Sequence, residues 1–331
     1  MSAAVDSRVL YGTQIIGTGA AFPERILTNQ DLVEQLARDG VETNDEWILK
    51  RTGIKERRIS DPNNPDERNS SLAARAAIQA LEMAGLKPTE IDFIILGTSS
   101  PDQLVPSTAC LVQAKIGATQ AWACDLTAAC AGFTYALAMA DAFIRSGQAK
   151  RGLVIGSEVM SSITNWKDRG SCILFGDAAG AIVVQQTDAQ NPRRVLHSKL
   201  WADGRHGALL EIPYGETKVT MQGREVFKYA VKVMCDLAVE VAEEAGFQLK
   251  DIDWLVAHQA NMRIIDSMAE RLEFPIEKML LNIERFGNSS AATIPTLLDE
   301  GIRSSRVKKG QLLMLDGFGA GFTAAANLVR F

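Results

Sequence analysis

The chain has 331 residues, of which 47% are hydrophobic and 23% are charged, and its formal net charge at pH 7 is −5. This composition is typical of a globular protein with two domains or one large α/β domain. The negative charge argues against a broad nucleic-acid surface, although a local basic patch could still bind an acidic partner. No stretch approaches the roughly 18 apolar residues that a membrane span needs. Residues 1–10 contain Asp6 and Arg8 and no apolar run, so we expect no signal peptide and a cytoplasmic location.

Five cysteines occur along the chain, and no two of them form a Cys-x-x-Cys pair. They are Cys110, Cys124, Cys130, Cys172 and Cys235. An odd number without such pairs argues against a disulfide framework and against a zinc knuckle. Each cysteine is therefore either a small packing residue or a reactive thiol. We expect no metal site.

Near the N-terminus, GTGAAF (Gly17 to Phe22) begins like a dinucleotide-binding fingerprint. Phe22 occupies the position of the third glycine, and Pro23 follows it, so the pattern does not predict a nicotinamide cofactor.

Further along, three segments recur in the same order. MAGLKPTEIDFIILGTSS (83–100) is matched by EAGFQLKDIDWLVAHQAN (244–261), 161 positions later. IRSGQAKRGLVI (144–155) is matched by IRSSRVKKGQLL (302–313), 158 positions later. GDAAGAIVV (176–184) is matched by GFGAGFTAA (317–325). Three matches in one order predict two similar halves.

Each half is predicted to run helix, strand, turn, helix, strand, a glycine-rich corner and a last strand. The strand-like runs FIILG, LVIGS and LLMLDG are almost continuously apolar and alternate with helical patterns, which favours mostly parallel sheets buried on both faces. The polar stretch QQTDAQNPRR places a boundary near residues 186–195. We expect an N-terminal half over residues 1–186 and a C-terminal half over residues 187–331.

Cys130 lies in DLTAACAGFTYAL (Asp125 to Leu137), where a strand-like run turns into an alanine-rich helical pattern. A helix N-terminus favours a thiolate, so Cys130 in that position would be a good nucleophile. The local offset of 158 makes Asn288, in GNSS, its counterpart in the second half. His258 ends the run DWLVAH, and active sites in α/β folds gather at strand ends. Packing of the halves about a pseudo-twofold axis would bring the three residues together.

Each of the three also has a structural interpretation. Cys130 could be a packing residue, His258 a hydrogen-bonded polar residue and Asn288 a helix cap. The same side-chain types also occur in papain-like hydrolases, where the asparagine orients the histidine. The duplicated α/β pattern and the missing CGSCW-type signature argue against a protease.

Motifs along nearly the whole chain resemble those of β-ketoacyl-acyl-carrier-protein synthase III, an initiating condensing enzyme of type II fatty-acid synthesis in the thiolase superfamily. In chain order they are IIGTGAAFPE, DEWILKRTGIKERR, ACAGFTYAL, DRGSCILFGDAAGA, HQANMRII, RFGNSSAATIP and FGAGFTAAANLVRF. A thiolase would add a second catalytic cysteine and an elongating synthase a second histidine, so one Cys, one His and one Asn favour the initiating branch. The resemblance implies an α/β, thiolase-like five-layered αβαβα fold, with two duplicated halves and mostly parallel mixed sheets, and a homodimer.

The resemblance also implies a ping-pong reaction. Cys130 would accept the acyl group from acyl-CoA, and malonyl-acyl-carrier protein would then lose CO2 and attack it to give a 3-oxoacyl product. The backbone N–H groups of Cys130 and Ala320 would bind the oxyanion, and Phe318 would disfavour the malonyl carboxylate. The side chains of His258 and Asn288 would donate hydrogen bonds to the enolate. Ala320 replaces a glycine of the family and would be strained if its φ were positive.

Binding residues carried over by the resemblance fall into three groups. Trp47 and Arg169 would flank the adenine of CoA. The whole CoA site would comprise Trp47, Arg51, Thr52, Arg169, Phe227, Ala260 and Asn261. Acyl-carrier protein would dock on Lys228, Arg263 and Arg271, for which a solvated helix face is the alternative. Leu104 and Val105 would form a wall of the acyl pocket across the dimer interface.

Two other functions stay open at this point. A synthase with the same three residues could make a ketone, an alkylquinolone precursor or a polyketide starter unit. A cysteine hydrolase would instead release free acid from acyl-CoA.

Overall fold

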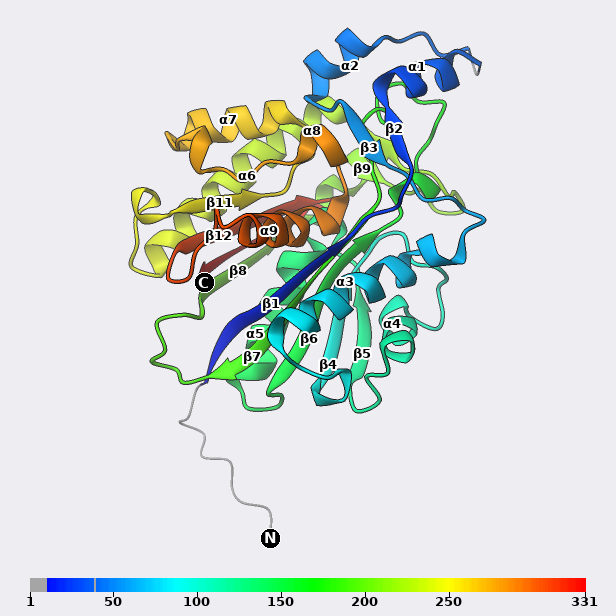
Figure 1. Ribbon diagram of the computed structural model, residues 1–331. Coiled ribbons are helices and arrows are strands. Elements are labelled where there is room, and N and C mark those ends of the chain that lie inside the picture. Colours follow the sequence, from blue (N-terminus) through cyan, green and yellow to red (C-terminus); the bar gives the residue numbers. More distant parts are fainter. Residues whose placement is uncertain (1–10, 39) are drawn as a thin grey trace.

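Two β-sheets form the core of the protein, and the computed structural model describes residues 11–38 and 40–331 (Figure 1). The expectation about residues 1–10 therefore lies outside the described part of the chain. The first sheet has the order β1 (Gly12–Ala21), β7 (Ala178–Thr187), β6 (Arg151–Glu158), β4 (Phe93–Gly97) and β5 (Trp122–Leu126). The second has the order β11 (Trp254–Ala257), β12 (Leu312–Gly319), β13 (Thr323–Arg330) and β8 (Val195–Ala202).

Helices cover the outer faces of both sheets and fill the space between them. Helices α3 (Asn69–Ala84) and α4 (Thr108–Ile116) pack on the first sheet, and α6 (Gly223–Glu244) and α7 (Met262–Leu272) pack on the second. Helices α5 (Gly132–Arg145) and α9 (Thr293–Arg303) lie between the sheets, where Phe133, Ile182 and Leu315 share one apolar cluster (Figure 1). This arrangement confirms the five-layered αβαβα, thiolase-like fold.

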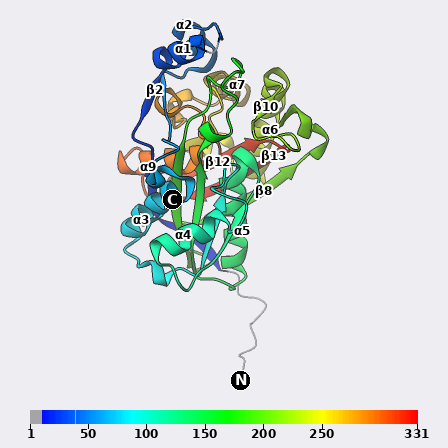
Figure 2. The ribbon, with the colours of Figure 1, turned by 90° about the vertical axis from the view of Figure 1, so that its right-hand side faces the viewer.

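A small cap stands at one end of the sheets (Figure 2). It is made of β2 (Ile26–Thr28), α1 (Asn29–Arg38), α2 (Asp45–Thr52) and β3 (Glu56–Arg58). Its apolar residues Leu32, Ile48 and Ile54 share a cluster with Ile173 and Phe175, so the cap packs on the segment that precedes β7. Three further short elements are β9 (Leu210–Glu211), β10 (Thr220–Met221) and α8 (Ile283–Phe286).

Strand direction differs from the expectation of mostly parallel sheets. The pairs β4–β5, β4–β6 and β11–β12 are parallel, whereas β1–β7, β6–β7, β12–β13 and β13–β8 are antiparallel. Strand β13 follows β12 after three residues, which are too few for a crossover, so it returns antiparallel to β12. Strand β7 follows β6 after a longer connection and is antiparallel to it as well. The sheets are mixed, as the resemblance implies, but antiparallel pairs outnumber parallel pairs in them.

The two halves repeat one succession of elements with a spacing of 161 residues. Strands β4 and β11 begin at residues 93 and 254, β6 and β12 begin at 151 and 312, and α5 and α9 begin at 132 and 293. The spacing falls to 158 at the ends of α5 and α9, because α9 has 11 residues and α5 has 14. The internal duplication is therefore visible in the fold.

This spacing corrects the pairing of Cys130 with Asn288. At the helix starts the counterpart of Cys130 is Ala291, 161 positions later, and Asn288 is instead the counterpart of Thr127. The backbone agrees, because Ala129 and Ser290 both adopt a left-handed conformation, with φ of 46° and 50°. The offset of 158 came from a segment beyond the shortened helix and does not apply before it.

Two glycines allow the halves to approach each other closely. A Cβ on Gly156, in β6, would lie 2.1 Å from the carbonyl oxygen of Ala291, at the start of α9. A Cβ on Gly317, in β12, would lie 3.2 Å from the Cα of Ala131, at the start of α5. A strand of each half thus passes against the helix start of the other half, which brings the two helix starts to one interface.

We expect Gly156→Ala to lower the free energy of unfolding by about 3 kcal/mol, because the new methyl group meets backbone that cannot rotate away. Gly204→Ala is the matched control, since no atom lies within 4 Å of a Cβ there, and it should change stability by less than about 0.5 kcal/mol. Urea unfolding of both variants measures the difference. Equal effects would contradict the close approach.

Candidate active site

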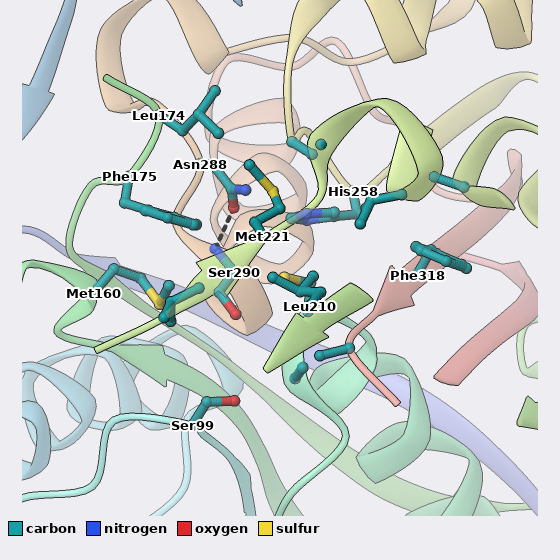
Figure 3. Close-up of a pocket in the computed structure, with 18 of the residues that line it drawn as sticks. Ser99, Met160, Leu174, Phe175, Leu210, Met221, His258, Asn288, Ser290 and Phe318 are labelled. Atoms are coloured by element: carbon teal, nitrogen blue, oxygen red, sulfur yellow. Dashed lines mark hydrogen bonds between the residues drawn. The ribbon is translucent and has the colours of Figure 1, made fainter. Parts of the chain in front are cut away.

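One large cavity lies where the two halves meet, and Cys130, His258 and Asn288 all line it. Its volume is about 1050 Å³. Cys130 lies in the short 3₁₀ turn Ala129–Ala131 that leads into α5, and His258 directly follows β11. Asn288 precedes the corresponding turn, Ser290–Ala292, which leads into α9. Figure 3 shows the side chains of His258 and Asn288 reaching the cavity from different elements.

Cys130 is half-buried, and its thiol is far less acidic than the helix-start position predicts. Burial is the main reason that the pKa of the Cys130 thiol rises to about 12, and the nearby Glu158 carboxyl group raises it further. Hydrogen bonds from the Ser290 side chain and from the backbone of Cys130 oppose this rise. Burial therefore opposes the effect of the helix N-terminus, which contributes about 0.3–1 kcal/mol at exposed sites, and the nucleophilic role of Cys130 stays a prediction.

His258 is buried, with 3% of its surface exposed, and its backbone N–H donates to the carbonyl oxygen of Asp316 at 2.8 Å. Burial lowers the pKa of His258 to about 4. The imidazole is therefore neutral near pH 7 and carries one N–H, so it can donate one hydrogen bond without bearing a charge.

The depressed pKa of His258 makes stability depend on pH. An unfolded histidine binds a proton near pH 6.5, whereas the folded one does so only near pH 4, so acid favours the unfolded chain. We expect this group to remove about 3 kcal/mol of folding free energy as the pH falls from about 7 to 4. Denaturant unfolding of the wild type and of His258→Gln over this range isolates the effect. Identical pH slopes for the two proteins would contradict it.

The backbone of Asn288 is held on both sides by the segment before β7. Its N–H donates to the Leu174 carbonyl oxygen at 2.8 Å, and its carbonyl oxygen accepts from Gly176 N at 3.0 Å. The side-chain Oδ1 accepts from the Ser290 backbone N–H at 2.9 Å (Figure 3). Asn288 thus stabilises a turn rather than capping α9, whose N-cap is Ala292. With Oδ1 occupied in this way, Nδ2 is the donor that the amide offers to the cavity.

Phe318 and Ala320 also line the cavity, at the end of β12 and just beyond it. Ala320 is not one of the described non-glycine residues with positive φ, so the strain considered for alanine at this position does not arise. Gly321 adopts the positive φ instead, at 137°. An alanine is therefore sterically acceptable where the family has glycine.

The residues expected to bind CoA gather around one end of the cavity. Arg51, Thr52, Phe227, Ala260 and Asn261 line it. Thr52 is buried, and its hydroxyl group donates to the Ile48 carbonyl oxygen at 2.7 Å, while Asn261 caps α7 by accepting from Ile264 N at 3.1 Å. Both polar side chains therefore also have structural roles.

Trp47 and Arg169 lie beside this end of the cavity and are stacked directly on each other. The guanidinium carbon of Arg169 is 3.9 Å from the Trp47 ring centroid, and that of Arg51 is 5.2 Å away. An adenine can enter between Trp47 and Arg169 only if the Arg169 side chain moves aside. The structure thus brings Trp47 and Arg169 together, but they are in direct contact and leave no space for an adenine between them.

The three cations expected to bind acyl-carrier protein differ in their surroundings. Arg263 lines the cavity and lies 5.8 Å from the Phe227 ring centroid. Lys228 and Arg271 are instead ion-paired on the helix surface, each at 2.9 Å, with Glu225 and Asp236 respectively. Arg271 is also eight residues beyond Arg263 on α7, which is about 12 Å along the axis.

Leu104 and Val105 are among the most exposed apolar side chains, at 91% and 82%. Leu104 lines the cavity, but Val105 does not in the single chain. Their proposed contribution to an acyl pocket across a dimer interface stays a prediction.

Other residues of the cavity were not singled out from the sequence. Apolar side chains dominate its wall: Met160, Leu174, Phe175, Leu210 and Met221 (Figure 3). Ser290 lines it as well, and its hydroxyl group bonds to the buried Glu158. Glu158 directly follows the apolar run LVIGS, and a charged residue at the end of a buried strand needs polar partners. This position could have identified Glu158 from the sequence. Ser290 left no comparable signal.

The structure contains neither a membrane-spanning helix nor a metal cluster in the part of the chain that it describes. No helix in residues 11–38 or 40–331 is long and apolar enough to cross a membrane. Within the same residues, no group of three or more His, Cys, Asp or Glu side chains is arranged to hold a metal ion.

Comparisons with known proteins identify the family of the chain. Two family models match, one described as 3-oxoacyl-[acyl-carrier-protein] synthase III over residues 124–204 and one as the C-terminal part of that enzyme over residues 242–331. A β-ketoacyl-[acyl-carrier-protein] synthase III of Xanthomonas euvesicatoria is 45% identical and covers 98% of this chain and 100% of its own.

Solved structures show the same relationship. The 3-oxoacyl-[acyl-carrier-protein] synthase III of Aquifex aeolicus is 46% identical, with a TM-score of 0.91, over 97% of this chain and 100% of its own. The priming β-ketosynthase of the R1128 polyketide pathway is 32% identical, with a TM-score of 0.90, over 99% of this chain and 98% of its own. With the duplicated fold and the Cys130, His258 and Asn288 cavity, these matches establish that the chain belongs to the 3-oxoacyl-[acyl-carrier-protein] synthase III family of condensing acyltransferases.

Proposed function

We propose that this protein condenses an acyl-CoA primer with malonyl-acyl-carrier protein through an acyl-Cys130 intermediate, giving 3-oxoacyl-acyl-carrier protein, CoA and CO2, and so initiates type II fatty-acid biosynthesis. The observation that carries the proposal is that Cys130, His258 and Asn288, from distant parts of the chain, line one apolar cavity. The reaction involves no net oxidation and acts on thioesters, which are already activated, so we propose no metal and no nicotinamide cofactor. Substrates of this kind support a cytoplasmic location.

The first half-reaction is an acyl transfer to sulfur. The Cys130 sulfur attacks the thioester carbonyl, and the backbone N–H groups of Cys130 and Ala320 stabilise the oxyanion, each donor contributing about 2.7–4 kcal/mol in comparable enzymes. The carbon–sulfur bond to CoA then breaks, and CoA leaves as a thiol. Trp47, Arg51 and Arg169 would hold the nucleotide end of CoA, after Arg169 moves off the Trp47 ring.

The second half-reaction forms the carbon–carbon bond. Malonyl-acyl-carrier protein loses CO2, and the electron pair becomes an enolate whose oxygen accepts hydrogen bonds from the imidazole N–H of His258 and from Nδ2 of Asn288. The ring of Phe318 offers the malonyl carboxylate no hydrogen bond, which favours its departure. The carbanion attacks the acyl group, the Cys130 sulfur leaves, and one proton from solvent restores the thiol.

We propose a homodimer that completes the acyl pocket. Strand β5 is an edge of the first sheet, and Trp122 on it is 41% exposed. An unpaired edge strand and the exposed side chains of Leu104 and Val105 are features that a second copy would cover. The loop that carries Leu104 and Val105 would then reach the neighbouring cavity.

The proposal is tested by a product assay with acetyl-, butyryl- or octanoyl-CoA and malonyl-acyl-carrier protein, with Cys130→Ala as control. We expect a 3-oxoacyl-acyl-carrier protein from at least one primer, and mass spectrometry should find the acyl group on Cys130 alone among the five cysteines. Absence of that product with every primer would refute the proposal, and release of free acid instead would identify a thioester hydrolase.

A specialised synthase is the second candidate, and the likeness to the R1128 priming β-ketosynthase favours it specifically. The two candidates share the same chemistry and differ in the primer and in the fate of the product. Preference among the three primers separates a short-chain initiating enzyme from one that accepts longer chains, while a ketone or quinolone product would identify the specialised activity.

We expect Arg263→Glu to raise the KM for malonyl-acyl-carrier protein about tenfold or more, because it reverses a charge at the cavity mouth that would face an acidic carrier. Acylation by acyl-CoA should change little. Steady-state kinetics with each substrate varied in turn measures both effects. Equal loss with both substrates would show that Arg263 has no role specific to the carrier.

A further inference from the structure

A buried carboxyl group joins the two halves of the chain behind the cavity wall. Glu158, at the end of β6, is fully buried and accepts hydrogen bonds from the Ser99 backbone N–H at 3.0 Å and from the Thr98 hydroxyl group at 3.2 Å. The Ser100 hydroxyl group also bonds to it. From the other half, the Ser290 hydroxyl group bonds to its Oε1 at 2.9 Å. Burial of a carboxyl group is costly without such partners, so this cluster fixes the position of Glu158.

The backbone of Ser290 adopts a conformation that requires support. Its φ is 50°, in the left-handed region that residues other than glycine rarely adopt. Such conformations persist where the surrounding structure holds them. The side chain of Ser290 is held by Glu158 Oε1, and its backbone N–H donates to Asn288 Oδ1 at 2.9 Å (Figure 3). Ser290 is therefore fixed between a buried carboxyl group and the amide of Asn288.

The bond between Ser290 and Asn288 decides which end of the amide can face the enolate. A backbone N–H can only donate, so it selects the amide oxygen and leaves Nδ2 as the group available to the cavity. An amide turned over about its last bond would present Oδ1 instead. An amide oxygen repels the negative oxygen of an enolate, whereas an N–H stabilises it.

We propose that Glu158 and Ser290 are positioning residues that hold the Asn288 amide with Nδ2 toward the enolate, so that they serve condensation and not acylation. Glu158 fixes the Ser290 hydroxyl group, and Ser290 fixes the oxygen of Asn288. Neither residue gains or loses a proton in this role. The role requires an oxygen that accepts from the Ser290 hydroxyl group, but no negative charge on that oxygen. The inference rests on the proposed function, since it concerns the second half-reaction of that scheme.

The test measures the two half-reactions separately in Ser290→Ala, Glu158→Met and Glu158→Gln, with Ser289→Ala as the control. Ser289 is the adjacent serine and is as buried as Ser290, at 2% exposed, but its hydroxyl group bonds to Thr293 and it does not line the cavity. Mass spectrometry of single-turnover acylation by acetyl-CoA reports the first half-reaction. The rate at which the preformed acyl-enzyme condenses with malonyl-acyl-carrier protein reports the second.

We expect Ser290→Ala and Glu158→Met to slow condensation about tenfold to 100-fold and to change acylation less than about threefold. The loss is smaller than the 10² to 10³ that removal of a whole donor costs, because a freely turning amide still presents Nδ2 part of the time. The concentration of malonyl-acyl-carrier protein that gives half the maximal rate should change little, since the bond to Nδ2 strengthens only as the enolate forms. Glu158→Gln should condense within about threefold of the wild type, because its amide oxygen still accepts from Ser290. Ser289→Ala should match the wild type.

A double-variant comparison separates positioning of the amide from a general structural role. In an Asn288→Ala background there is no amide to orient, so the addition of Ser290→Ala should slow condensation by less than about twofold further. A role confined to the stability of the turn predicts that Ser290→Ala has its full effect in that background as well, and this outcome would overturn the inference.

Two further results would also overturn it. One is equal slowing of acylation and condensation by Ser290→Ala. The other is a Glu158→Gln that condenses as slowly as Glu158→Met, because a charge would then be required. If thermal unfolding shows that a Glu158 variant does not fold, Ser290→Ala and Ser289→Ala decide, alone and in the Asn288→Ala background. A wild type that acylates Cys130 but forms no 3-oxoacyl product would refute the proposed function and this role with it, whereas the other outcomes leave the proposed function intact.

Discussion

Cys130→Ala is expected to form no acyl-enzyme and no 3-oxoacyl product, while it still decarboxylates malonyl-acyl-carrier protein. The thiol is the acyl acceptor, so its removal ends both transfer and condensation. Decarboxylation needs the hydrogen-bond donors of His258 and Asn288 and the apolar ring of Phe318, and all three stay in place. We expect the decarboxylation rate to fall by less than about tenfold, because the change removes only the sulfur atom and leaves the hydrogen-bond donors in place.

The measurement pairs mass spectrometry of the acyl-enzyme with CO2 release from labelled malonyl-acyl-carrier protein. Cys124→Ala is the matched control, since that cysteine is also half-buried and does not line the cavity. It should retain both reactions. Acyl label on Cys130→Ala at any other cysteine would contradict the assignment of the nucleophile.

Asn288→Asp is expected to slow condensation about 10² to 10³-fold and to leave acylation of Cys130 nearly unchanged. The substitution keeps the shape of the side chain and an oxygen that accepts from Ser290 N. It replaces the Nδ2 donor by a carboxylate oxygen, which repels the enolate instead of stabilising it. Loss of one donor to an oxyanion costs about 10² to 10³ in other enzymes, and the added charge acts in the same direction.

Separate assays of acylation and condensation resolve this prediction. Asn64→Asp is the matched control, because Asn64 Oδ1 also accepts a backbone N–H two residues on, from Asp66 at 3.0 Å, at an exposed site away from the cavity. It should behave as the wild type. An equal loss in both half-reactions of Asn288→Asp would mean that the asparagine only maintains the structure of its turn.

Several features of the fold could be predicted from the amino-acid sequence because they depend on local patterns. Continuous apolar runs such as FIILG and LVIGS predicted buried strands, and three matched segments predicted the duplication that the sheets show. Strand direction was not predictable in this way, because a strand buried on both faces has the same apolar sequence pattern in a parallel and in an antiparallel sheet. The return of β7 and β13 beside their neighbours depends on the path of the chain at the glycine-rich corners.

The counterpart of Cys130 shows a second limit of local comparison. Matched segments beyond α5 and α9 indicated an offset of 158. Helix α9 is three residues shorter than α5, and this difference becomes apparent only when the two helices are compared in the structure. The conclusion that Cys130 and Asn288 share a cavity still holds, because strands of each half pack against the helix start of the other half.

The sequence by itself determined the duplicated fold and the three residues, Cys130, His258 and Asn288, that carry the proposed chemistry. Only the tertiary structure decided how acidic they are and what they contact, because pKa values depend on burial and on neighbours that are remote along the chain. Burial makes the Cys130 thiol weakly acidic and keeps His258 neutral. Ser290 and Glu158 are 132 residues apart, and only the packing of the two halves brings them into hydrogen-bond contact.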